Sequence, residues 1–353
     1  MGTLREQYVR LSWKKGILFG ICMAALLILA VAACCLGVAD LTPGRLLVTY
    51  LPGMDRILSA GPLTPREENI LLMLRLPRVA AGIAAGASLG TAGAAMQAIT
   101  GNQMASPFTT GLSSAAALGA AAVIVFGGVS AGMVKTATVL AAFVMAVLCA
   151  MLVFGIAGVK GMGAESLVLT GIALNYLFSA LNSTMQFIAN EDQLPAIVHW
   201  SFGSLNSVGW TDICIMAAIF LSAFPAVFSQ GWAFNLMEGG GDEAARALGI
   251  NTGRARLLTG GAVTLLTAGT VSFTGVIGFV GLAAPHIARL LVGNDYRQVT
   301  PFSAVTGAML VLAADTLGRN AFSPTTLPVG IVVSYVGVPL FLFLILKERR
   351  GGL

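Results

Sequence analysis

Residues 16–38 read GILFGICMAALLILAVAACCLGV, an uncharged stretch that directly follows Lys14 and Lys15. A helix that crosses a bilayer needs about 20 apolar residues, whereas the apolar part of a secretory signal is only about 7–15 residues long. The stretch is too long for a signal of that kind. We therefore predict that residues 16–38 form a first membrane-spanning helix.

The rest of the chain has the same character. Hydrophobic residues make up 57% of the sequence, charged residues only 10%, and the mean hydropathy is +0.87. About 25% of the residues of an ordinary soluble domain are charged, so this composition excludes a soluble domain of that kind. Apolar runs broken by Gly, Pro or charge predict ten spans, at 16–38, 76–99, 107–127, 134–157, 166–189, 211–229, 254–274, 276–293, 301–318 and 327–346.

These spans predict an all-α integral membrane protein with about ten transmembrane helices in one bundle. No linker long enough to separate domains is present, so we expect a single permease domain over residues 1–353. The 43 glycines fit this prediction, because small residues let membrane helices approach one another closely.

The charged residues indicate an orientation. Most of the 20 Lys and Arg residues face the cytoplasm if the N-terminus is inside, as expected from the excess of positive charge in cytoplasmic loops. They are Arg5, Arg10, Lys14, Lys15, Lys160, Arg246, Arg254, Arg256, Arg289, Arg297, Lys347, Arg349 and Arg350. We predict a multi-pass protein of a bacterial or archaeal inner membrane with both termini cytoplasmic. The net charge of +5 forms no basic stripe, so lipid is an expected partner and nucleic acid is not.

Several chemistries have no motif in this sequence. The five cysteines lie in apolar runs without CxxC spacing, so we expect no disulfide framework, metal site or cofactor. H-E-x-x-H, G-x-S-x-G and paired intramembrane carboxylates are absent, which argues against an intramembrane enzyme. The loop G-x-x-x-x-G-K-[ST] that holds nucleotide phosphates is also absent. If ATP drives this protein, a separate subunit must hydrolyse it.

Four ordered stretches of sequence stand out. The first is Leu74-Arg75-Leu76-Pro77-Arg78, followed by 101–107, which reads GNQMASP. The second is 167–174 (LVLTGIAL) with 199–205 (HWSFGSL) downstream. The third is 244–250 (AARALGI), and the fourth is 278–289 (GFVGLAAPHIAR) with Ala314-Asp315 and 327–331 (LPVGI).

Together these stretches resemble the FecCD family of ABC importer permeases over residues 70–350. The resemblance implies the type II ABC importer fold and import of a ferric siderophore or a similar metal chelate, with haem and cobalamin as alternative cargoes. It implies three kinds of protein partner: a cytoplasmic ABC ATPase dimer, a second copy or paralogue of the permease, and an extracytoplasmic substrate-binding protein. A passive channel or an ion-coupled carrier remains the alternative from outside the family.

The resemblance also implies roles for individual residues. Arg75, Arg78 and Arg319 match positions that receive acidic residues of the binding protein, the other possibility being lipid anchoring or pairing with Glu67, Glu68 or Asp315. The segment 238–254 matches the ATPase-coupling segment, through Asp242, Glu243, Ala244, Arg246, Ala247, Leu248 and Gly249. Asn102 and Met104, with Ala164 and Glu165, match the inner gate, although Gln103 stands where the family has proline.

The residues themselves support some of these roles. Asp242 and Glu243 favour a helix start at 242–250, because acidic groups stabilise the positive end of the helix dipole. Asn175, Asn182, Ser183, Thr184 and Gln186 recur three and four residues apart along one apolar span. We expect them to line a cavity or to hydrogen-bond a neighbouring helix. We expect Arg289 and Asp315 to pair helices and His286 to have a structural role.

Overall fold

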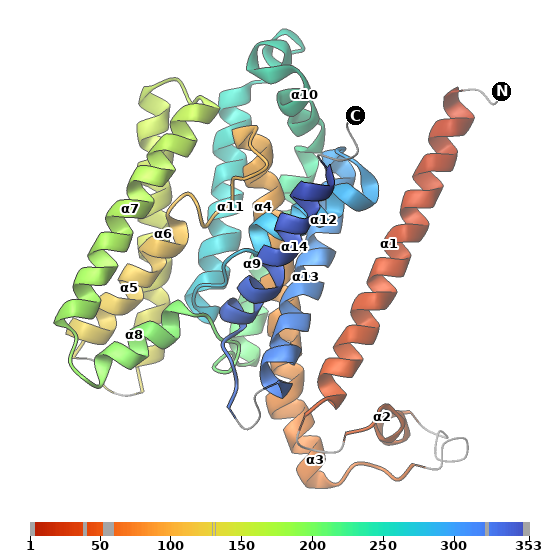
Figure 1. The fold of residues 1–353 in the computed structure, drawn as a ribbon, viewed down its shortest axis with the longest axis vertical. Helices are drawn as coiled ribbons and strands as arrows, with labels where there is room; N and C mark the ends of the chain where they lie inside the picture. The colour runs from red at the N-terminus through yellow and green to blue at the C-terminus, as the bar shows by residue number, and fades with distance from the viewer. Residues whose placement is uncertain are drawn as a thin grey trace. The chain divides into compact units, whose positions relative to one another are not determined.

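The computed structural model describes residues 4–37, 41–51, 60–128, 130, 132–321 and 325–348, and these residues are helical with no strand among them (Figure 1). Two compact units result, residues 1–79 and residues 80–353.

The first unit contains α1 (Leu4–Cys35), α2 (Pro43–Tyr50), α3 (Pro65–Ile70) and the π-helical turn η2 (Leu71–Arg75). Thr64 caps α3 through a reciprocal capping box with Glu67, which satisfies two backbone donors that a helix start otherwise leaves unpaired. The carboxylate of Glu67 also accepts two hydrogen bonds of 2.7 Å from Arg45. This bidentate pair joins α2 to α3.

Apart from residues 76–79 of the first of them, the remaining helices lie in the second unit. They are α4 (Leu76–Thr100), α5 (Leu112–Phe126), α6 (Val134–Val159), α7 (Ala164–Ile188), α8 (Gln193–Ser201), α9 (Trp210–Ser229), α10 (Gly231–Ala247), α11 (Thr252–Thr274), α12 (Val280–Val292), α13 (Tyr296–Asn320) and α14 (Val329–Glu348). Within this unit α10 lies at the upper end in Figure 1, and α8 lies at the opposite end.

Each of the ten predicted spans contains one helix. Among the described residues, seven helices are long and apolar enough to cross a membrane: Trp13–Cys35, Pro65–Thr100, Val134–Val159, Ala164–Ile188, Trp210–Ser229, Thr252–Thr274 and Tyr296–Asn320. Three shorter apolar helices, Leu112–Phe126, Val280–Val292 and Val329–Pro339, fall in the other predicted spans.

Two of the predicted spans begin too early. α5 starts at Leu112 because the preceding residues form turns and Gly111 has φ 84°. α12 starts at Val280 because Gly275 and Phe279, both at φ 69°, interrupt the helical conformation between α11 and α12. An apolar composition continues through both breaks, so hydropathy alone does not reveal them.

Glycines on α4 allow the helices at the centre of the second unit to approach closely. A Cβ atom added at Gly86, Gly90 or Gly93 would overlap backbone atoms of Gly307, Ser303 or Gly281, respectively. The three glycines are four and three residues apart, so they form one face of α4. α12 and α13 pack against that face at backbone distance, as the glycine content of the sequence predicts.

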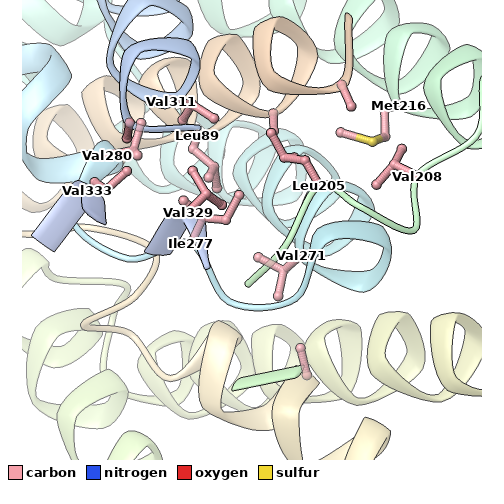
Figure 2. Close-up of a cluster of buried hydrophobic side chains, with 14 of the residues drawn as sticks. Leu89, Leu205, Val208, Met216, Val271, Ile277, Val280, Val311, Val329 and Val333 are labelled. Atoms are coloured by element: carbon pink, nitrogen blue, oxygen red, sulfur yellow. The ribbon is translucent and has the colours of Figure 1, made fainter. Parts of the chain in front are cut away.

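A cluster of aliphatic side chains fills the space beside this contact (Figure 2). Its labelled members come from α4, α9, α11, α12, α13, α14 and the segments between them: Leu89, Leu205, Val208, Met216, Val271, Ile277, Val280, Val311, Val329 and Val333. The cluster joins helices that are distant in sequence, and it fixes the positions of their ends.

Candidate functional site

The predicted coupling segment is a separate short helix. α10 contains a break at Gly241, where φ is 72° and ψ is 179°, and the helix resumes at Asp242. It ends at Ala247, followed by Gly249 at φ 87°, whose N–H bonds Arg246 O at 2.9 Å. The helix predicted at 242–250 is therefore present but three residues shorter, because glycine adopts this left-handed conformation and ends the helix.

One face of the short helix is buried and the other is exposed. Ala245 has no exposed surface and packs with Met237 and Ala255. Leu248 is 66% exposed, and the other outward residues are Glu243, Ala244, Arg246 and Ala247. The outward face is therefore the side of this helix that a partner can reach.

The predicted gate residues lie in the loop after α4 and in the first turn of α7, both in the second unit. Asn102 Oδ1 accepts a hydrogen bond of 2.9 Å from Met104 N, which shapes the loop after α4. Gln103 Nε2 lies 3.4 Å from Glu238 Oε1 on α10. Ala164 and Glu165 form the first turn of α7, and Glu165 is exposed.

One side chain joins the two gate segments. The guanidinium of Arg256 donates to Ile99 O, at the end of α4, and to Met162 O, in the loop before α7. It also forms a bidentate pair with Asp242 of the coupling segment. Sequence reasoning used Arg256 only to assign topology. The available signal was an arginine in the first turns of a predicted span, where an ionisable group needs a partner.

Some polar residues of α7 hydrogen-bond the neighbouring helix α5, and some line a groove. Asn175 Oδ1 accepts a 2.6 Å hydrogen bond from Ser114 Oγ on α5, and Asn182 Nδ2 lies 3.4 Å from Ser114 O. Beside these contacts is a groove of about 250 Å³. Its lining is Phe108, Ser113, Ser114, Ala117, Ser179, Asn182, Ser183, Gln186, Ser201 and Val276. Hydroxyl and amide groups line this groove, and no charged side chain does.

The three arginines predicted to dock a binding protein have different surroundings. Arg75 is buried in the first unit and donates to Cys34 O and Cys35 O at 2.6 and 2.8 Å. It therefore binds the last carbonyls of α1, where a cation is favoured by the helix dipole. Arg78 is half-buried. Arg319 lies 3.1 Å from Asp315 on the same helix, the pairing that the sequence left as the alternative.

Arg289 pairs helices, as expected, whereas Asp315, of which we expected the same, lies 3.1 Å from Arg319 on its own helix. Arg289 donates to Gln97 Oε1 on α4 at 2.6 Å and to the Tyr296 hydroxyl at 2.9 Å. Within the part of the chain that the structure describes, no three His, Cys, Asp or Glu side chains gather as metal ligands. The second unit thus combines a polar groove with a separate short helical segment at one end.

Comparison with known proteins identifies the architecture. An ABC transporter permease of Methanocaldococcus jannaschii is 39% identical over 354 residues, with 98% of each chain covered. The Fe(3+)-citrate import system permease YfmE of Bacillus subtilis is 36% identical and covers 93% of this chain and 96% of its own. A solved structure described as an inward-facing metal-chelate type ABC transporter matches at TM-score 0.81 and 28% identity, over 94% of this chain and 99% of that one.

The family model described as the FecCD transport family matches residues 22–347. Nearly the whole chain is covered, including all four stretches that carry the resemblance in sequence. The chain belongs to the FecCD transport family and is a multi-pass membrane permease.

Proposed function

We propose that this chain is the membrane subunit of an ATP-driven importer that carries an iron chelate into the cytoplasm. The observation that carries the proposal is the uncharged polar groove on α7 in a chain of the FecCD family. A chelate presents oxygen and nitrogen atoms around a metal that is already coordinated. Hydroxyl and amide groups hydrogen-bond such a surface without competing for the metal.

The groove also suits transport because its binding is weak. Neutral hydrogen bonds contribute about 0.5–1.5 kcal/mol each, about half the contribution of bonds to charged groups. A few such contacts orient a cargo and still release it. Asn175 and Asn182 are the residues that we assign to this path, and a second copy of the permease, or a paralogue, would supply its other wall.

The other proposed parts are a contact and a gate on the cytoplasmic side and a contact at the outer face. A cytoplasmic ABC ATPase dimer binds the segment 242–249, and both termini lie on the same cytoplasmic side. The loop with Asn102 and Met104 and the first turn of α7 with Ala164 and Glu165 form the inner gate. An extracytoplasmic binding protein contacts Arg75, Arg78 and Arg319 at the outer face.

Uptake in cells that lack their own importer tests the proposed cargo. The chain is expressed with its cognate ATPase and binding protein, and uptake of iron-55 citrate, hemin and cobalamin is compared. We expect ATP-dependent uptake of the iron chelate. Uptake of hemin or cobalamin alone would show that the cargo is wrong, and the absence of ATP dependence would indicate an ion-coupled carrier.

The groove has its own test. Replacing both Asn182 and Gln186, the two amide side chains of the lining, with leucine keeps their approximate size and removes the amides. We expect uptake to fall about tenfold or more, since one lost contact of about 1.4 kcal/mol already gives that factor. Thr184→Val on the same helix is the matched control, because Thr184 is exposed and outside the groove lining. Unchanged uptake by the double variant would place the path elsewhere.

A further inference from the structure

Arg256 joins three segments that are far apart in the sequence. Its side chain is 3% exposed. Nε donates to Ile99 O at 2.8 Å and Nη1 to Met162 O at 3.0 Å. Nη1 and Nη2 donate to the two carboxylate oxygens of Asp242 at 2.5 and 2.7 Å. All four contacts lie within the second unit.

The two carbonyl groups need such a donor. Ile99 is in the last turn of α4, where carbonyls have no partner within the helix, and Met162 lies in the loop between α6 and α7. Met162 also has φ 58°, a conformation that costs free energy for a side chain of this size. The bond from Arg256 therefore holds a loop in a shape that its own sequence disfavours.

The guanidinium makes the junction stiff. Its donors form a planar fork, so the ion pair with Asp242 fixes the orientation of the same group that bonds the two carbonyls. Because the group is buried, a contact that breaks leaves polar atoms without water to replace it. A movement of Asp242 is therefore transferred to the ends of α4 and α6 or else breaks the junction.

We propose that Arg256 is a positioning residue that transmits movement of the coupling segment 242–249 to both gate segments, 99–105 and 160–165. The proposal rests on the proposed function, in which an ATPase moves the coupling segment. Gln103 of the first gate segment also lies 3.4 Å from Glu238, in the part of α10 that precedes the break at Gly241. This contact joins the gate segment to α10 but not to the segment 242–249.

The first test measures coupling in the complete complex of permease, ATPase and binding protein in liposomes. Arg256→Lys keeps the charge and loses the fork, and we expect the number of chelate molecules imported per ATP hydrolysed to fall about tenfold or more. Asp242→Asn should do the same. Arg254→Lys is the matched control, since Arg254 lies on the same helix and is exposed.

A role in folding alone predicts a different result. Loss of folded complex would lower hydrolysis and import together and leave their ratio at the original value. Thermal unfolding of each variant is measured beside the ratio. A ratio in Arg256→Lys equal to that of Arg254→Lys would overturn the proposal.

The second test needs neither ATP nor a partner. Hydrogen exchange of the purified permease is measured at amides in 100–105 and 160–164, in Arg256→Gln and in Arg254→Gln. Loss of a charge-assisted hydrogen bond changes a local opening equilibrium by about tenfold or more, so we expect exchange at both loops to quicken by that factor only in Arg256→Gln.

The two tests separate the inference from the proposed function. Faster exchange at both loops supports the junction even if the complex imports no chelate. Exchange that is unchanged, or that quickens at only one loop, would overturn the claim that Arg256 holds both gate segments.

Discussion

Gly93 provides a quantitative test of the packing at the centre of the second unit. A Cβ atom at this position would overlap Gly281 O and would lie 2.6 Å from Gly281 Cα, whereas ordinary contact begins at 3.4 Å. Both obstacles are backbone atoms, so no side chain can rotate away. In Gly93→Ala, α4 and α12 must separate by about 1 Å, the shortfall in contact distance, and the aliphatic cluster beside them must loosen.

The destabilisation by overpacking is partly offset by the higher helix propensity of alanine. Alanine is favoured over glycine in a helix by about 1 kcal/mol, whereas overpacking typically costs about 1–3 kcal/mol, occasionally more. Because the added atom meets rigid backbone, we expect the upper part of that range or more, and a net loss of about 2 kcal/mol. In a domain of 150–250 residues a loss of 1 kcal/mol shifts the Tm by about 2–4 °C. We therefore expect the Tm in detergent to fall by about 5 °C.

Gly155→Ala is the matched control. Gly155 is also a helix glycine, on α6, but an added Cβ meets no atom within 4 Å. This variant should melt at or above the temperature of the parent protein. A Gly93→Ala variant that is as stable as Gly155→Ala would refute the backbone contact between α4 and α12.

Three further predictions concern the ATPase contact, the binding-protein contact and the ion pair of Asp295 with Arg297. Leu248→Glu should prevent co-purification of the ATPase, because Leu248 is exposed at the tip of the proposed coupling segment; undiminished recovery of the ATPase would contradict docking there. Arg78→Glu should slow association of the binding protein and make it less dependent on salt, as measured by surface plasmon resonance at two ionic strengths; an unchanged rate and salt slope would exclude the contact. Hydrogen bonds from Arg297 lower the pKa of Asp295 to about 2, and a lowered pKa stabilises the folded state above the unfolded pKa of about 4. Asp295→Asn should therefore lower the Tm at pH 7, and the difference should shrink as the pH falls from about 4 towards about 2; a difference independent of pH would show that the carboxylate charge is not responsible.

The sequence predicts the helices well because burial in lipid requires long apolar runs, and each predicted span contains one helix. It does not predict where α5 and α12 begin, because left-handed residues such as Gly111 and Phe279 interrupt the chain without a change in hydropathy. The helix after Gly241 was predictable from Asp242 and Glu243.

The candidate site is less accessible to sequence reasoning, because its contacts are non-local. Arg256 is separated by 157 residues from Ile99 and by 94 from Met162, and nothing in the local pattern reveals that they meet. Arg75 shows the same difficulty. A motif match indicates an outer arginine, and only the folded first unit reveals that its side chain binds the end of α1.

We propose above all that this permease imports its cargo with the energy of ATP that a separate subunit hydrolyses. The most direct measurement uses sealed liposomes that contain the permease and its ATPase, with binding protein and iron-55 citrate on the outer side and ATP inside. We predict accumulation against the concentration gradient that requires ATP and continues when ionophores remove every ion gradient. Accumulation without ATP that ionophores abolish would contradict the account.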